Sequence, residues 1–380
     1  MINGSYRQCK RCVMDTTALD IIFDDEGICN YCKDYLERYS FFINEKKPDK
    51  QNRMKILVEK VKKSGKNKPY DCVVGISGGV DSSWTLVEVK KLGLRPLAVH
   101  MDNGWNSELA QNNIANLVRE LGVDLYTHVI DWEEYRDLMQ AFFDGDVIDV
   151  ELLYDNATLA VNYGQAKKYN IKYILAGTNI ATEGMSIPRR WNWFKFDKQN
   201  IKALARRNKI INFKTFPSIG TFGFVWNHFI RRIRWISFLD YLDYNKFHSL
   251  NALEKKYGYK RYPYKHYESI FTRFYQGYLL PNKFGVDKRK IHLGNLIMSK
   301  QMKREEALKI LQDIPYPSLA EMNSDKNYFL KKMKWSEEQL NNYIKRSEIL
   351  HSDYSSEKYI WDKLNTFYKY FFKSKKNNKL

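Results

Sequence analysis

The sequence lacks a long uncharged hydrophobic run. Its most membrane-like stretch, residues 222–242, contains Arg231, Arg232 and Arg234 near its middle. Each arginine would cost about 2.5–3.5 kcal/mol at the centre of a bilayer, so this stretch is not expected to span a membrane. We expect a buried or interfacial helix here, and packing in the core is favoured. The N-terminus, MINGSYRQCKRC, has no apolar segment with a cleavage site, so no signal peptide is expected.

Cysteine is also scarce. Cys9, Cys12, Cys29 and Cys32 form two C-x2-C pairs separated by sixteen residues, a spacing typical of a structural four-thiolate zinc site. An iron–sulfur cluster and disulfides are the alternatives, and disulfides fit poorly with a cytosolic type of chain. The fifth, Cys72, lies in the apolar run YDCVVGI and is expected to be a small buried hydrophobe. No cysteine is therefore evident for sulfur transfer or glutamine hydrolysis.

Acidic residues are outnumbered, with 44 Asp and Glu against 63 Lys and Arg, which gives a net charge of +19. This excess implies an anionic partner: a nucleotide, a nucleic acid, a phosphorylated sugar or an acidic membrane surface. Charge alone does not distinguish these partners. The 380 residues are enough to bury a sizeable core, as one large domain with attachments or as two domains.

Short apolar runs alternate with helical patterns from residue 70 onward. The expected strands cover residues 71–76, 96–101, 125–130 and 173–176, and the expected helices begin at residue 80 or cover residues 107–121 and 155–169. This alternation predicts an α/β fold with a doubly wound parallel sheet. Ligands of such sheets bind at the carboxyl ends of the strands, where residues 77–83, Asp102 and residues 177–183 would meet.

The loop GISGGVDSS, residues 75–83, follows the first expected strand. Its glycines allow an anion to approach the backbone, and the next helix points its free N–H groups at the same place. The loop lacks the lysine that holds the γ-phosphate in the common nucleotide-binding loop, so it suits a pyrophosphate that departs as a unit. Asp81 would repel a phosphate, which favours a bridging Mg²⁺. A plain glycine-rich turn is the alternative.

The motif SGGVDSS resembles the signature of the PP-loop ATP pyrophosphatases, which split ATP between the α- and β-phosphates. AGTNIATEG, residues 176–184, resembles a segment of the NAD synthetases. The resemblance implies that Thr178 and Glu183 contact ATP or Mg²⁺, although their spacing also fits an ordinary turn after a strand. The implied ATP-binding residues are Ser77, Gly78, Gly79, Asp81, Ser82, Ser83, Asp102, Gly177, Thr178 and Glu183.

Residues 257–290 interleave aromatic, basic and acidic side chains without the period of a core helix. Aromatic faces suit sugar or base rings, and Lys and Arg suit phosphate or carboxylate groups. A helix over residues 266–278 would place Glu268, Thr272 and Tyr275 on one side. A solvated basic surface is the alternative to a ligand site.

Four motifs, CKRCVMDTT, SGGVDSS, KHYESIFTRFYQGYLLPNKFGVDKR and SKQMKREEAL, together resemble the N-acetyl sugar amidotransferases of surface-polysaccharide and flagellin-glycan biosynthesis. The resemblance covers most of residues 6–308, least clearly in the Trp-rich middle. It implies that ATP adenylates the acetamido oxygen of an activated sugar and that ammonia then displaces AMP. The implied catalytic residues are Asp81, Glu183, Lys265, Glu268 and Arg273, and the implied substrate-binding residues are His266, Thr272, Lys283, Lys288 and Arg289.

The same resemblance implies a separate glutaminase subunit that supplies ammonia, with ATP, Mg²⁺ and a structural Zn²⁺ as cofactors. The rival interpretation is a tRNA-modifying PP-loop enzyme of the thiolase or lysidine-synthetase type. Thiolases usually need reactive cysteines beyond a zinc site, so no nucleic acid partner is expected. We expect a cytoplasmic protein, whose basic end, residues 367–380, is a frayed tail or contacts the inner face of the cytoplasmic membrane.

The expected organisation is a fold of the PP-loop type with an N-terminal zinc ribbon and a mainly helical C-terminal part. The zinc ribbon and its linker cover residues 1–45, and the ATP-binding α/β domain covers residues 46–220. A mixed or helical substrate-binding region follows over residues 221–320. A helical basic tail covers residues 321–380.

Overall fold

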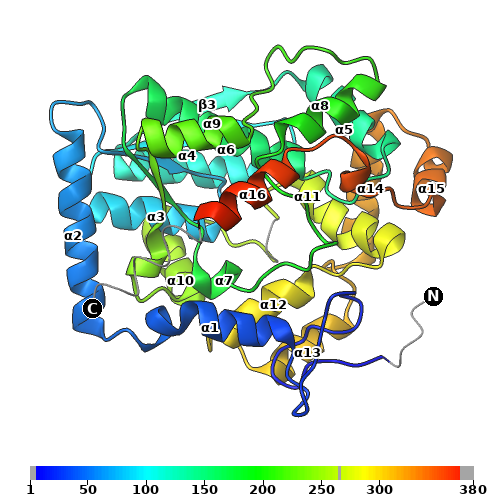
Figure 1. Cartoon of the computed structure of the whole chain (residues 1–380), viewed down its shortest axis with the longest axis horizontal. Helices are drawn as coiled ribbons and strands as arrows, with labels where there is room; N and C mark the ends of the chain where they lie inside the picture. The colour runs from blue at the N-terminus through cyan, green and yellow to red at the C-terminus, as the bar shows by residue number, and fades with distance from the viewer. Residues whose placement is uncertain (1–5, 264–266, 369–380) are drawn as a thin grey trace.

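A five-stranded parallel sheet lies between helices (Figure 1). The computed structural model describes residues 6–263 and 267–368. The strand order is β3-β2-β1-β4-β5, which confirms the predicted doubly wound parallel sheet. The strands are β1 (Cys72–Gly75), β2 (Pro96–Asp102), β3 (Asp124–Val129), β4 (Tyr173–Ala176) and β5 (Arg234–Ser237).

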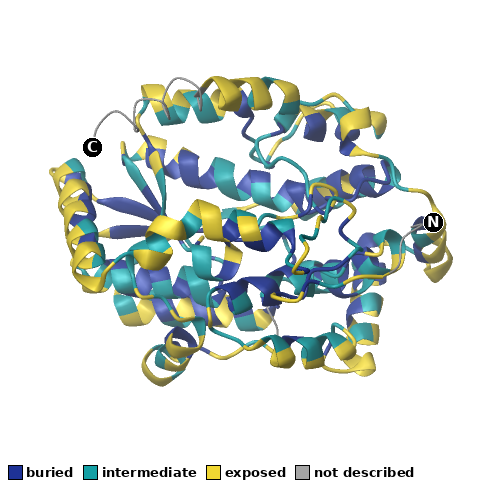
Figure 2. Ribbon diagram, turned by 60° about the horizontal axis from the view of Figure 1, so that its bottom comes forward, coloured by how far each residue is buried: buried dark blue, intermediate teal, exposed yellow. Residues whose placement is uncertain are grey.

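Successive residues of the central strands enter two separate cores. Val73 and Ile174 pack with α6 (Leu152–Lys168) on one face of the sheet, whereas Val74 packs with α3 (Val80–Lys91) on the other. Neighbouring side chains of a strand point to opposite faces, and these strands are buried on both faces, as Figure 2 shows by their dark blue colour. This is the pattern of a parallel sheet covered by helices on both sides.

The helices around the sheet begin and end where their capping residues predict. The Ser107 side chain accepts a hydrogen bond from the Ala110 N–H at the start of α4 (Glu108–Leu121), and Gly122 ends this helix at φ 55°. The sequence analysis did not predict α5. The other helical elements up to residue 257 are α1 (Asn30–Asn44), α2 (Lys47–Gly65), α5 (Trp132–Asp144), α7 (Ile180–Glu183), α8 (Lys198–Arg207), α9 (Thr221–Val225), η1 (Trp226–Ile230), η2 (Phe238–Tyr241) and α10 (Lys246–Tyr257).

The C-terminal part is helical and shares the core of the sheet domain. Its elements are α11 (Ile270–Phe274), η3 (Tyr275–Phe284), α12 (Arg289–Met298), α13 (Arg304–Gln312), α14 (Leu319–Met333), α15 (Glu337–Lys345), η4 (His351–Asp353) and α16 (Lys358–Tyr368). Phe271, Phe274 and Tyr275 are buried together with Phe329 of α14, so residues 257–290 do contain a core pattern, contrary to the prediction. The helix starts at Ile270 rather than at residue 266. Tyr275 points inward, and its hydroxyl donates to the Ile148 carbonyl.

Residues 222–242 were predicted to form a buried or interfacial helix, and the favoured alternative, packing in the core, is wrong. Their first part forms α9 and η1 on the surface, where Phe222 and Trp226 are 69% and 55% exposed. Their later part forms β5, which pairs with β4. The sheet therefore continues beyond residue 220. Among the described residues, no helix has both the length and the apolar character needed to cross a bilayer.

A buried histidine gives the fold a pH dependence. The His351 Nε2 accepts a hydrogen bond from the Asp149 N–H at 3.1 Å, so the neutral ring carries its proton on Nδ1, 2.7 Å from the Asn200 Oδ1. Burial lowers the pKa of His351 to about 4; the Asp149 carboxylate opposes this shift, and the Lys195 ammonium adds to it. Because the unfolded chain binds the proton already near the usual pKa of 6.5, stability should fall as the pH drops from about 6.5 to about 4.

Replacing His351 by glutamine should flatten this loss of stability between about pH 6.5 and pH 4, measured by urea unfolding at several pH values. His248→Gln is the matched control, because His248 is exposed at the surface of α10. An equal slope in the wild type and in His351→Gln would contradict the prediction.

Candidate functional site

The loop after β1 lies at the switch point of the sheet, between the carboxyl ends of β1 and β4. Its shape depends on hydroxyl groups. The Ser82 hydroxyl accepts from the Ser77 N–H at 3.2 Å, and the Ser77 hydroxyl accepts from the Gly79 N–H at 3.3 Å. Gly78 has φ 85°, and a Cβ at this position would lie 2.9 Å from the Ala110 carbonyl oxygen. The loop therefore needs glycine here for both its conformation and its packing.

Asp81, in the first turn of α3, is held from two sides. Its Oδ2 accepts from the Thr182 hydroxyl at 3.0 Å, and its Oδ1 accepts from the Tyr244 hydroxyl. The first contact joins the loop after β1 to α7, which follows β4. The second comes from the turn between η2 and α10, a contact that no sequence motif indicated. The carboxylate thus has a fixed place in the wall of the site.

The start of α3 packs directly against the end of β4. A Cβ on Gly177 would lie 2.8 Å from the Ser82 nitrogen and 2.9 Å from the Asp81 carbonyl carbon. Both neighbours are backbone atoms, so they cannot move without shifting the loop. Glycine at position 177 therefore sets the distance between the two segments that carry Asp81 and Thr178.

Gly177→Ala should lower ATP-dependent turnover about tenfold or more, because displacement of a binding group by about 1 Å can cost as much as 10²-fold. The measurement is AMP release under saturating ATP. Gly164→Ala is the matched control: a Cβ there meets nothing within 4 Å, and alanine favours the helix α6 by up to about 1 kcal/mol. Equal turnover in both variants would contradict the close contact.

Glu268 comes from the C-terminal part and reaches the loop of the sheet domain. Its backbone carbonyl accepts from the Ser107 N–H at 2.8 Å, and the Ile270 N–H donates to the Trp105 carbonyl at 2.9 Å. This short antiparallel contact positions the side chain: a Cβ on Gly79 would lie 2.4 Å from the Glu268 Oε1. The carboxylate therefore stands beside the loop that is expected to bind phosphates.

A cavity of about 710 Å³ opens between these segments. Its wall combines the loop after β1, one polar side of α6 and residues of the C-terminal part. Ten of the predicted site residues line it: Ser77, Gly79, Asp81, Ser82, Gly177, Thr178, Glu183, Glu268, Thr272 and Lys288. The cavity is large enough for a nucleotide and part of a second substrate.

Other predicted residues are placed elsewhere. Gly78 and Ser83 do not line the cavity. The Asp102 carboxylate accepts from the Gly104 N–H and the Asn106 amide after β2. Lys265 and His266 lie outside the described residues. The roles proposed for these residues stay predictions.

Arg273, predicted as catalytic, and Lys283 and Arg289, predicted to bind substrate, are engaged in ion pairs away from the cavity lining. Arg273 forms a two-pronged pair with Asp325, which is 4% exposed. Lys283 pairs with Asp146 at 2.9 Å, and Arg289 pairs with Asp287 at 2.8 Å. A cation that already neutralises a carboxylate at this distance offers less to a phosphate. Lys288 does line the cavity, and it pairs with Glu151 at 2.7 Å.

Several cavity residues were missed by the sequence analysis. Glu151, the N-cap residue of α6, and Asp155, Thr158 and Asn162 within α6 line the cavity. Asn162 is 2% exposed, and its Oδ1 has no hydrogen-bond partner, so it is an acceptor that a bound ligand could satisfy. The spacing of these residues at positions i, i+4, i+7 and i+11 is the only sequence signal, and it also fits an ordinary polar helix face.

Two further charged residues, Lys195 and Asp240, belong to the cavity or its immediate support. Lys195 lines the cavity between Asp149 at 2.6 Å and Asp155 at 2.8 Å. Asp240 accepts from the Ile180 N–H at 2.7 Å and so fixes the start of α7. Burial raises the pKa of Asp240 to about 6, although this hydrogen bond and nearby cations oppose the shift. Both residues are distant in sequence from the loop, which is why no local motif marks them.

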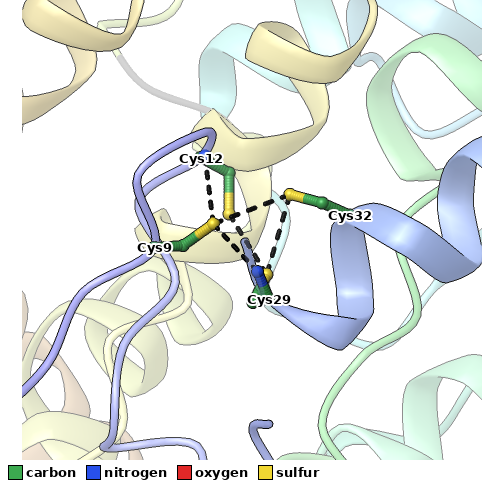
Figure 3. Close-up of side chains that lie close together, drawn as sticks. All are labelled: Cys9, Cys12, Cys29 and Cys32. Carbon is green, nitrogen blue, oxygen red and sulfur yellow. Dashed lines mark hydrogen bonds between the residues drawn. The ribbon is translucent and has the colours of Figure 1, made fainter. Parts of the chain in front are cut away.

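The four N-terminal cysteines form a separate cluster, and their sulfur atoms point toward one another (Figure 3). The Sγ–Sγ distances are 3.6 Å for Cys29–Cys32, 3.7 Å for Cys12–Cys29 and 3.9 Å for Cys9–Cys32. Sulfurs bound at about 2.3 Å to a tetrahedral zinc lie about 3.8 Å apart, so the cluster could bind zinc. All four cysteines are free rather than disulfide-bonded.

The cysteine cluster is attached to the wall of the cavity. The Arg304 guanidinium, from α13, donates to the Cys9 and Cys12 carbonyls at 2.9 Å. From α1, which begins at the cluster, the Arg38 guanidinium donates to the Gly184 carbonyl at 2.9 Å and the Tyr35 hydroxyl donates to the Ile180 carbonyl at 3.4 Å. These contacts hold α7, which carries Thr182 and Glu183.

Comparison with known proteins gives two family matches. Residues 50–186 match the family model of NAD synthase, and residues 268–369 match the model of the LPS biosynthesis protein WbpG-like, C-terminal domain. The first match contains the loop with Asp81 and the segment with Glu183. The second begins at Glu268 and covers Thr272 and Lys288. No curated protein matches the chain.

Solved structures give weaker similarities. NMN synthetase from Francisella tularensis is 20% identical over 35% of this chain and 56% of its own, with a TM-score of 0.25. NH3-dependent NAD synthetase from Campylobacter jejuni is 16% identical over 43% of this chain and 74% of its own, with a TM-score of 0.28. The assignment therefore rests on the two family matches. The chain joins an ATP-using domain of the PP-loop ATP pyrophosphatase type to a WbpG-like C-terminal domain, and this combination supports its resemblance to the sugar amidotransferases of that branch.

Proposed function

We propose that this chain converts the acetamido group of an activated sugar into an acetamidino group at the expense of ATP. The observation that supports this most directly is the shared cavity. Asp81 and Thr178 from the NAD synthase-like region and Thr272 and Lys288 from the WbpG-like region line one chamber. ATP at the loop and a sugar against the C-terminal residues would meet there.

The reaction would proceed in two steps. The acetamido oxygen attacks the α-phosphorus of ATP, a new P–O bond forms, and pyrophosphate leaves. Ammonia then attacks the activated carbon, the C–O bond to AMP breaks, and the product carries NH where the substrate carried O. An amide oxygen is a poor leaving group, and adenylation makes it a good one. The chain's contribution would be positioning and stabilisation of charge.

The loop would provide the donors for the departing pyrophosphate. Ser77 and Ser82 line the cavity at the start of α3, where the first N–H groups of the helix have no partner within the helix. Asp81 would hold a Mg²⁺ ion that neutralises the phosphates, since carboxylate oxygens are ligands this ion prefers. Glu268 lies beside Gly79 at the same end of the cavity. There it would orient the acetamido group or accept a hydrogen bond from an N–H of the incoming ammonia.

Ammonia would come from a separate glutaminase subunit. Cys72, the one cysteine outside the four-cysteine cluster, is buried in β1, and burial raises the pKa of its thiol. A thiol in this state is a poor nucleophile. We therefore expect the purified chain to use ammonium salts and to show no turnover with glutamine.

The test uses the purified full chain with ATP, Mg²⁺ and isotopically labelled ammonium, together with either nucleotide-linked acetamido sugars or bulk tRNA. Sugar-dependent AMP release with labelled nitrogen in the product would support the proposal. AMP release that depends on tRNA would assign the chain to the rival class of tRNA-modifying enzymes. Robust turnover with glutamine in place of ammonium would overturn the need for a partner subunit.

A further inference from the structure

Two neighbouring helical segments expose large apolar side chains to solvent. On α9 and η1 the exposed residues recur at positions i, i+4, i+7 and i+8, which places them on one side of the continuous helix. We call the combined region the α9–α16 surface. It consists of Phe222, Trp226, Phe229, Ile230, Tyr359, Leu364 and Phe367, and the exposed fractions of these residues run from 39% to 69%.

The two segments are fixed to each other by their inward-facing residues. The Trp361 ring of α16 lies 5.3 Å from the Phe224 ring of α9 and 5.6 Å from the Phe196 ring. At the start of both helices, the Glu357 carboxylate accepts from the Thr221 N–H. The outward-facing side chains are therefore held on one rigid platform. The end of α16 lies at the rim of the molecule (Figure 2).

Positive charge surrounds these apolar side chains. Arg231, Arg232 and Arg234 directly follow η1, and the latter two are exposed. On α16, the Lys363 ammonium lies 4.3 Å from the Tyr359 ring centre, while the nearby Asp362 carboxylate is paired with Lys358. The sequence beyond α16, residues 369–380, adds five lysines and three aromatic residues and contains no acid.

We propose that the α9–α16 surface binds an anionic lipid bilayer. Trp and Tyr are enriched at the membrane–water interface, and Trp, Phe and Leu form the apolar face of interfacial helices. Each Lys or Arg beside them contributes about 1 kcal/mol on an anionic leaflet. A second copy of the chain fits this surface less well, because pairing would bring the arginines of both copies together. Trp235, next to Arg234, lines the cavity, so a bilayer at this surface would lie near the substrate chamber. The inference does not depend on the reaction proposed above.

The test is co-flotation of the purified full chain with vesicles of phosphatidylcholine alone or mixed with phosphatidylglycerol. We expect binding to the anionic vesicles that weakens in high salt, and little binding to neutral ones. Phe222→Ser with Trp226→Ser should reduce binding about tenfold or more, and Arg232→Gln about fivefold. Ile22→Ser is the matched control, because Ile22 is 70% exposed on the N-terminal segment between the two cysteine pairs.

Three results would overturn the proposal. One is the absence of binding, or equal binding to neutral and anionic vesicles. A second is unchanged binding by the Phe222/Trp226 variant together with complete loss when the five lysines of residues 369–380 become glutamine, which would assign binding to the tail alone. A third is a concentration-dependent dimer in light scattering that the Phe222/Trp226 variant abolishes, which would assign the surface to self-association.

Discussion

Replacing Asp81 by asparagine should lower AMP formation about 10²–10³-fold while the chain stays folded. The asparagine side chain has the same size and can still accept from the Tyr244 hydroxyl, so the loop should keep its shape. It lacks the negative charge needed to hold Mg²⁺ next to the phosphates. The measurement is AMP release over a range of Mg²⁺ concentrations, where the variant should need far more Mg²⁺ or fail to reach the wild-type rate.

Tyr244→Phe is the companion variant for Asp81. It removes one hydrogen bond to the carboxylate but leaves its charge, so a loss of about tenfold or less is expected, with the Mg²⁺ dependence unchanged. This comparison separates two roles. If Asp81 only joins the loop to α7 and to the turn before α10, both variants should lose thermal stability and keep the same Mg²⁺ dependence. That result would remove Asp81 from the proposed metal site.

The sheet was predictable because its central strands leave a strong local signal. Val73 and Val74 are both buried, so β1 reads as a continuous apolar run that ends in a glycine-rich loop. In contrast, β5 lies in a stretch whose apolar residues also fit a helix. Only its pairing with β4 shows that this stretch forms a strand. That contact joins residues about sixty positions apart. Local propensity cannot anticipate such a pairing.

In the candidate site as well, some residues could be predicted from local motifs and others could not. The motif around Asp81 and the segment with Glu183 were visible as short patterns, and the structure brings them together in one wall. Tyr244 and Lys195 could not be predicted, because their place in the site depends on contacts with residues far away in the sequence. Lys283 was predicted to bind substrate, yet it pairs with Asp146. A basic residue in a sequence does not reveal whether its counter-ion is a ligand or a carboxylate of the same chain.

Removing one ligand of the cysteine cluster should affect both stability and turnover. Cys12→Ser should abolish tight zinc binding and lower the free energy of unfolding by about 3 kcal/mol or more, since structural zinc contributes directly to folding. Turnover should fall as well, because α1 begins at the cluster and contacts the backbone of α7 through Tyr35 and Arg38. A loosened α7 would release the Thr182 hydroxyl from Asp81. Metal content, unfolding by urea and AMP release are the three measurements.

Cys72→Ala is the matched control for this prediction, because Cys72 is buried in β1 and is not part of the four-cysteine cluster. It should retain one zinc per chain and lose only about 1 kcal/mol of stability. Cobalt in place of zinc should give the absorption of a tetrahedral four-thiolate site in Cys72→Ala but not in Cys12→Ser. Iron with visible absorption in the purified protein would contradict zinc and favour a cluster. Full turnover by metal-free Cys12→Ser would show that α7 keeps its place without the ribbon, and would leave the cysteines with a role in stability alone.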